Sequence, residues 1–237
     1  MGLTRIFMAL LSIAFCYGVN AQKIQQTLPE KTRILFVLDA SGSMQAAWEN
    51  NISRMDAAKG ILAKLVDSLK SNKNLELALR VYGHRYPRQA NNCQDSFLEV
   101  PFGVKNHNAI IAKIKEIKPV GTTPITYSLL QAAKDFPANT AGYRNIIILI
   151  TDGIESCGGD PCKTSIEFQK KGIFLRPFVI GLGLKGSEVL DCVGQFFNTE
   201  SSNNFNQTLN NTIETTFSKT TVSVELASRR YELLCTC

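Results

Sequence analysis

Two short apolar runs, each ending in an acidic residue, do most to limit how this 237-residue chain can fold. Residues 34–38 lead into Asp39, and residues 145–150 lead into Thr151-Asp152-Gly153. Short runs rich in Ile, Leu and Val are typical of strands that are buried on both faces of a sheet. We therefore expect two central strands, each with polar groups at its carboxyl end.

Segments with apolar residues at helical spacing alternate with further strand-like runs. The first helix is expected to begin after Ser53, which has the features of an N-cap, and to end near Lys70. Other helices are expected around 110–117, 125–135, 161–171, 187–194 and 204–217, and strands at 75–82, 97–102, 173–180 and 196–197. This alternation predicts an α/β fold with a doubly wound, mostly parallel central sheet and helices on both faces. In such folds ligands bind outside the carboxyl ends of the strands.

The residues after the first strand suit a hard divalent cation. Asp39 is followed by hydroxyls at alternate positions, Ser41 and Ser43, and Mg²⁺ prefers oxygen ligands. Taken alone, Ser-Gly-Ser could be a turn with a helix cap, and Asp152-Gly153 a plain turn. Together with Thr123 of a Gly-Thr-Thr-Pro loop, these groups should meet on one rim of the sheet. Their coincidence favours a metal site.

The three motifs, in this order, resemble the metal-ion-dependent adhesion site of von Willebrand factor A domains. The resemblance covers about residues 31–218, and the tail 219–237 is interpreted as the start of a truncated β module. It implies that Ser41 and Ser43 bind Mg²⁺ (or Mn²⁺ or Ca²⁺) directly. It also implies that Thr123 binds directly or through water. Asp39 and Asp152 would act mainly through water and by orienting the serines. The commoner loop is Gly-Gly-Thr, where this chain has Thr122 before Thr123.

The resemblance also implies a function. Neutral hydroxyl ligands leave much of the cation's charge uncompensated, so the cation can accept an anion, typically an Asp or Glu carboxylate of a partner protein. We therefore expect an adhesion-type binding module and no enzyme. One alternative is a hydrolase that uses the same site, but the only histidines are His84 and His107 and a Gly-x-Ser-x-Gly motif is absent. The other is a chelatase-type partner of a cytosolic ATPase.

Residues 1–21 have the pattern of a signal peptide, which disfavours a cytosolic role. Arg5 precedes an apolar stretch, and Val19-Asn20-Ala21 suits cleavage before Gln22. An uncleaved anchor is less favoured, because the stretch is only about 14 residues and a bilayer needs ~20. Acylation at Cys16 is the remaining alternative. We expect an exported protein, periplasmic, cell-surface or secreted, with no stable membrane span after cleavage.

Cleavage would leave an even number of cysteines, which in an exported chain indicates disulfides. They are Cys93, Cys157, Cys162, Cys192, Cys235 and Cys237. Their pairing is open. Cys157 and Cys162 are the best candidates for a local bridge, because two glycines and a proline lie between them. Zinc binding there is the weaker alternative.

A narrower resemblance, to exported bacterial von Willebrand factor A proteins, rests on Val81-Tyr-Gly-His-Arg, Cys93-Gln-Asp and the 157–162 segment. His84 would then lie on the metal rim, either as a ligand contact or as a hydrogen-bonded structural histidine. Trp48 is either an exposed partner contact or buried against the first helix. The net charge of +6 is spread along the chain without a basic run, so nucleic-acid binding is not expected.

Overall fold

The computed structural model describes residues 31–138, 142–170, 178–182, 190, 192–193 and 195–199. The predicted signal peptide, the helix at 204–217 and the tail 219–237 lie outside the described residues. Most of the strand predicted at 173–180 and of the helix predicted at 187–194 also lies outside them.

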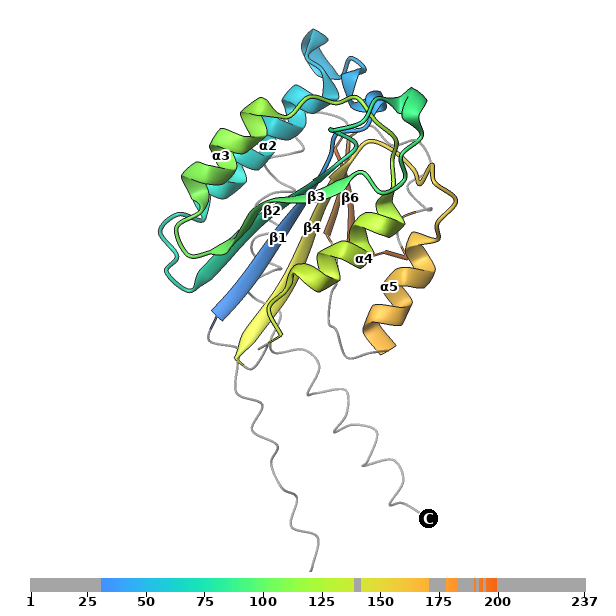
Figure 1. Ribbon diagram of the computed structural model, residues 1–237. Helices are drawn as coiled ribbons and strands as arrows, with labels where there is room; N and C mark the ends of the chain where they lie inside the picture. Colours follow the sequence, from blue (N-terminus) through green and yellow to red (C-terminus); the bar gives the residue numbers. More distant parts are fainter. Residues whose placement is uncertain are drawn as a thin grey trace, which may run out of the picture.

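Six strands form one sheet in the order β3-β2-β1-β4-β5-β6, as Figure 1 shows. Their bounds are β1 (Lys31–Asp39), β2 (Leu75–Tyr82), β3 (Ser96–Gly103), β4 (Tyr143–Thr151), β5 (Phe178–Leu182) and β6 (Gln195–Thr199). β1 pairs in parallel with both β2 and β4, and β5 and β6 continue the parallel order. β3 runs antiparallel to β2 at the edge. The predicted doubly wound, mostly parallel sheet is confirmed.

Helices cover both faces of the sheet. α2 (Arg54–Ser68) and α3 (His107–Glu116) pack on one face, and α4 (Ile125–Asp135) and α5 (Pro161–Lys170) on the other (Figure 1). Short 3₁₀ turns are η1 (Gly42–Gln45), η2 (Glu49–Asn51) and η3 (Arg88–Ala90). Ser53 caps α2 as predicted, because its Oγ accepts the N–H of Asp56 at 3.0 Å.

The core lies on either side of β1. Ile34, Phe36 and Leu38 pack in one apolar cluster with residues of α2 and α3. Leu35 and Val37 point to the other face, into a cluster with residues of α4 and α5. These five side chains are at most 1% exposed, so β1 is buried on both faces, as its unbroken apolar run predicted.

The ends of β1 and β4 lie at the topological switch point of the sheet, where the order of successive strands reverses. From β1 the chain builds outward to β2 and β3 on one side, and from β4 to β5 and β6 on the other. In open α/β sheets the crevice at such a point is the usual ligand site. Asp39 ends β1 and Thr151 ends β4, so both predicted acidic motifs lie at this crevice.

Two disulfides replace the predicted local bridge. Cys93 pairs with Cys157, and Cys162 pairs with Cys192, so the prediction of a Cys157–Cys162 bond was wrong. Pro161 starts α5 and takes Cys162 into the helix, while Cys157 stays on the preceding loop beside Cys93. Because both cysteines are bonded, a zinc site on them is also ruled out. In the described part of the chain, no helix has both the length and the apolar character to cross a membrane.

Candidate metal centre

Asp39 ties the ends of the two central strands together. Its Oδ1 accepts the backbone N–H of Ser41 at 2.7 Å, and its Oδ2 accepts the hydroxyl of Thr151 at 2.6 Å. Tyr82, the last residue of β2, donates its hydroxyl to Thr151 at 3.2 Å. Asp39, Tyr82 and Thr151 are all fully buried. This chain of hydrogen bonds joins β2, β4 and β1 beneath the site.

The two serines are linked to the second acidic residue, Asp152, through Ser43. The Oγ atoms of Ser41 and Ser43 lie 3.0 Å apart, and the Ser43 hydroxyl donates to Oδ1 of Asp152 at 2.8 Å. Ser43 lies in the η1 turn, which is anchored by the buried Met44. Ser43 is partly exposed whereas Ser41 and Asp152 are buried. The cluster therefore reaches solvent through Ser43.

Thr123 reaches the same place from the loop before α4. The neighbouring Gly121 pairs with the residues after β1 and β2: its C=O accepts the N–H of Gly42 at 2.9 Å, and its N–H donates to Gly83 at 2.8 Å. A Cβ atom placed on Gly153 would lie 3.7 Å from Oγ of Ser43 and 3.8 Å from Oγ1 of Thr123. The hydroxyls of Ser43 and Thr123 thus border one small space. The structure brings together all five residues that the sequence singled out.

Arg54 was not foreseen from the sequence. As the first residue of α2, it donates from Nη1 to Oδ2 of Asp152 at 2.7 Å. Both oxygens of Asp152 are therefore occupied, one by Ser43 and one by Arg54. A basic residue in the first turn of a helix opposes the helix dipole. That local misfit was the signal that could have identified Arg54 as a residue held there by a nearby acid.

Comparison with known proteins identifies the family. Residues 34–219 match the model of the von Willebrand factor type A domain. This chain belongs to the von Willebrand factor A family.

Relatives and solved structures agree with that assignment. The chain is 29% identical to the uncharacterized protein YwmC of Bacillus subtilis (strain 168), over 77% of this chain and 78% of that protein. Its fold is similar to that of the pilus adhesin SpaC from Lactobacillus rhamnosus GG, with a TM-score of 0.65, 14% identity and 81% of this chain covered. It is also similar to proximal thread matrix protein 1 from the mussel byssus with a zinc-occupied MIDAS motif (TM-score 0.58, 23% identity, 78% of this chain). The match spans 31% of SpaC and 46% of the mussel protein.

The residues of this von Willebrand factor A domain fit a hard divalent cation. Three hydroxyl groups and two carboxylates converge, and such oxygen donors suit Mg²⁺, Mn²⁺ or Ca²⁺. Across the described residues, no group of three or more His, Cys, Asp or Glu side chains is placed to hold a metal ion. The hydroxyl-rich cluster would hold an ion through Ser41, Ser43 and Thr123, whose hydroxyls lie near one another. Asp39 and Asp152 would orient these hydroxyls and balance part of the charge of the cation.

Burial sets the electrostatics of the cluster. It raises the pKa of Asp39 to about 6, and the negative charge of Asp152 adds to the shift, while hydrogen bonds from Thr151 and Ser41 oppose it. Burial and the Asp39 charge also raise the pKa of Tyr82 well above its usual value. Tyr82 therefore keeps its proton and serves as a fixed donor to Thr151. A cation at the site would favour the ionised form of Asp39.

His84 and Trp48 both contact other residues of the domain, His84 through a hydrogen bond and Trp48 through apolar packing. His84 follows β2, and its Nε2 lies 3.0 Å from Glu99, which also binds Arg85 at 2.5 Å. Burial lowers the pKa of His84. Trp48 is partly buried against the core cluster of α2 and α3. The structural alternative for each residue is thus favoured over a contact with a ligand or partner.

Proposed function

We propose that this von Willebrand factor A domain is an exported, adhesion-type module that binds Mg²⁺, or Mn²⁺ or Ca²⁺, and docks a protein carboxylate on it. The observation that supports this proposal most directly is the chain of contacts from the Ser41 hydroxyl to the Ser43 hydroxyl and from Ser43 to Asp152, in the crevice at the ends of β1 and β4. This cluster is open to solvent through Ser43. Fold similarity to a pilus adhesin supports an adhesion-type role.

The charge balance favours an anionic partner group. Asp39 and Asp152 bring two negative charges, and Arg54 already neutralises part of them. A divalent cation would supply an excess positive charge and an open coordination position there. Ser41 and Ser43 add no charge, and Arg54, with part of its side chain exposed, would also attract an anion. An Asp or Glu side chain of a partner protein has the required charge and reach.

Export is supported by the cysteines. Two disulfides within the described residues suit an oxidising compartment, and the pattern of residues 1–21 predicts a signal peptide. The protein would then be periplasmic, attached to the cell surface or secreted. Such a location would give the domain access to partners outside the cell.

A purely binding role is favoured over hydrolysis. A serine nucleophile needs a base within hydrogen-bond reach. Both ring nitrogens of His84 face carboxylates, Nε2 that of Glu99 at 3.0 Å and Nδ1 that of Asp95 at 3.9 Å, and not Ser41 or Ser43. His107 is the first residue of α3, which follows β3. Because β3 runs antiparallel to β2, it ends at the opposite end of the sheet from the metal cluster. Neither histidine therefore supports a serine–histidine pair at Ser41 or Ser43.

The metal part of the proposal is tested by calorimetry on the mature chain with Mg²⁺, Mn²⁺ and Ca²⁺. Binding is expected for the wild type and should be lost when Ser41→Ala and Ser43→Ala are combined. Ser68→Ala is the matched control, because Ser68 bonds Leu65 within α2 and does not contact the cluster. Equal cation binding by the double variant and the wild type would overturn the assignment.

The docking part is tested with immobilised peptides that differ only in a central Asp, Glu or Asn. The cation-loaded chain should be retained by Asp or Glu peptides and released by EDTA, because only a carboxylate can complete the coordination. Equal retention by the Asn peptides, or retention that persists in EDTA, would refute carboxylate docking on a metal. Hydrolysis of an ester panel that requires Ser41 and Ser43 would favour the enzyme alternative.

A further inference from the structure

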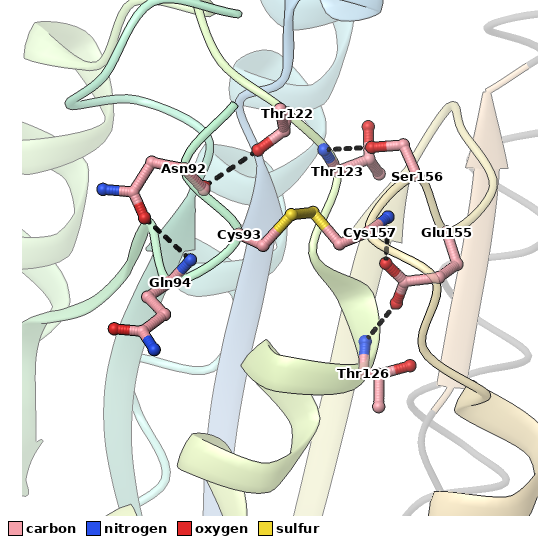
Figure 2. Close-up of a disulfide and its surroundings, with 9 residues drawn as sticks. All are labelled: Asn92, Cys93, Gln94, Thr122, Thr123, Thr126, Glu155, Ser156 and Cys157. Atoms are coloured by element: carbon pink, nitrogen blue, oxygen red, sulfur yellow. Dashed lines mark hydrogen bonds between the residues drawn. A yellow bond between two sulfur atoms is a disulfide. The ribbon is translucent and has the colours of Figure 1, made fainter. Parts of the chain in front are cut away.

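Thr123 is held at both of its backbone polar groups by one residue of another loop. The Oγ of Ser156 accepts the N–H of Thr123 at 2.9 Å, and the N–H of Ser156 donates to the C=O of Thr123 at 3.1 Å. Figure 2 shows Ser156 beside Thr123, on the loop that follows β4. These paired bonds fix the position of Thr123 relative to Asp152, which lies four residues before Ser156 in the sequence.

The loop that holds Thr123 is itself held. Glu155 accepts the N–H of Thr126, in the first turn of α4, at 2.7 Å with Oε2. With Oε1 it accepts the N–H of Cys157 at 2.8 Å. A carboxylate at the start of a helix is favourable because it meets free N–H groups and the positive end of the helix dipole. Glu155 thus fixes residues 155–157 against α4.

The other side of the Thr123 loop is bound to the loop after β2. Thr122 is 8% exposed and donates its hydroxyl to the C=O of Asn92 at 3.0 Å. The next residue, Cys93, is bonded to Cys157. In Figure 2 the disulfide joins the loop of Asn92, which contacts Thr122, to the loop of Ser156, which contacts Thr123. A closed frame results, and it joins residues 64 positions apart in the sequence.

We propose that the Cys93–Cys157 disulfide, with Thr122 and Ser156, is a positioning frame that holds the Thr123 hydroxyl ready for the cation. This inference rests on the proposed metal site. Asp39, Ser41 and Asp152 are placed by strand ends, whereas Thr123 lies in a loop before α4 and depends on its neighbours for its position. Metal affinity is lower when a ligand side chain must lose conformational freedom on binding. Residues that contact the ligands commonly hold them in the binding conformation beforehand. The proposal also accounts for Thr122 where the family commonly has glycine, because its hydroxyl makes the bond to Asn92.

The disulfide arm of the test compares two double variants of the mature chain, C93A/C157A and C162A/C192A, by the Kd for Mn²⁺. Each variant loses one disulfide, but only the first loses the disulfide that joins the loop contacting Thr122 to the loop contacting Thr123. We expect Mn²⁺ binding to weaken about tenfold in C93A/C157A and to stay within about twofold in C162A/C192A. Equal loss in both variants would mean that the frame acts only through general stability and would overturn the proposal.

A second set of variants, which changes the Thr122 hydroxyl and leaves both disulfides in place, tests the proposal even if a disulfide variant does not fold. Thr122→Val removes the bond to Asn92, and Thr164→Val is its matched control, because Thr164 is also buried and bonds a backbone C=O at 3.0 Å. We expect Mn²⁺ affinity to fall in Thr122→Val, to be unchanged in Thr164→Val, and to be restored in Thr122→Ser. Unchanged affinity in Thr122→Val would overturn the frame.

The outcomes separate this inference from the proposed function. If the wild-type chain binds no cation, the proposed metal site fails. If the wild type binds Mn²⁺ and all frame variants bind it equally well, the metal site stands and the positioning frame is refuted. A double-mutant cycle between Thr122→Val and C93A/C157A adds a direct check. Because both changes open the same frame, their effects on Mn²⁺ affinity should be less than additive.

Discussion

Asp39 makes the stability of the metal-free protein depend on pH. Its pKa of about 6 lies above the ordinary 3.8, so the folded chain holds this proton more tightly than the unfolded chain. The resulting stabilisation is fully present below about pH 3.8 and is lost as the pH rises through about 6. It amounts to about 3 kcal/mol. We expect the wild type to lose roughly that much free energy of unfolding, relative to Asp39→Asn, between about pH 4 and pH 7.

Urea unfolding of both proteins in EDTA measures this difference. The comparison with Asp39→Asn is needed because other groups titrate in the same range. Burial lowers the pKa of His84, and contacts with Arg85 and His84 lower the pKa of Glu99, so both destabilise the fold as the pH falls. If the difference in free energy of unfolding between the wild type and Asp39→Asn stayed constant with pH, the role given to Asp39 would be wrong.

Arg54 should weaken the binding of a cation. Its guanidinium group lies 2.7 Å from Asp152 and occupies the oxygen that Ser43 leaves free. A divalent ion must therefore share Asp152 with a positive side chain and is repelled by it. We expect Arg54→Gln to tighten Mn²⁺ binding by about fivefold, or about 1 kcal/mol, by calorimetry. Arg54→Lys keeps the charge and is expected to bind like the wild type. Weaker binding in Arg54→Gln would show that Arg54 positions Asp152 for the metal.

The turn after β2 leaves no room for a side chain at Gly83. Its φ is +71°, and a Cβ there would lie 2.6 Å from the C=O oxygen of Thr122 and 2.9 Å from the backbone nitrogen of Ser41. We expect Gly83→Ala to destabilise the fold by about 2–4 kcal/mol, from the backbone conformation and the overlap together. It should also weaken Mn²⁺ binding, because both crowded residues belong to the metal loops.

Gly60 provides the matched control for this turn. It lies within α2, and a Cβ there would meet nothing within 4 Å. Gly60→Ala should therefore stabilise the protein by about 0.5–1 kcal/mol and leave Mn²⁺ affinity unchanged. If chemical unfolding gave the two alanine variants similar stabilities, the crowding inferred at Gly83 would be wrong.

The elements that the sequence predicts well are those that bury an unbroken or periodic apolar pattern. β1, β4 and α2 follow from such patterns because burial alone sets the spacing of their apolar residues. The disulfide partners could not be predicted, since Cys93 and Cys157 are brought together by loops 64 residues apart. The partner of Arg54 could not be predicted for the same reason, since Asp152 lies 98 positions away; only the unfavourable place of Arg54 in the first turn of α2 indicated a nearby acid. The antiparallel β3 leaves a weaker trace, the lack of a crossover helix after β2.

The candidate site exists only in the folded molecule. Its residues come from the end of β1, the loop before α4 and the end of β4, and the sheet order makes these segments neighbours. In an unfolded chain the Asp39 and Asp152 carboxylates have no fixed relation to the Thr123 hydroxyl. A cation that needs all three segments therefore binds the native state and has little affinity for the unfolded one. Binding and folding are thereby coupled.

Cation binding should accordingly raise the melting temperature. At a free Mn²⁺ concentration of about 100 times its Kd, the gain is about 2.7 kcal/mol. For a domain of this size that is roughly a 5–10 °C rise. Thermal unfolding of the mature chain in Mn²⁺ and in EDTA measures it, with combined Ser41→Ala and Ser43→Ala as the variant that should not respond. Ser68→Ala should respond like the wild type. An equal rise in the serine double variant would place the stabilising cation somewhere other than the β1–β4 crevice.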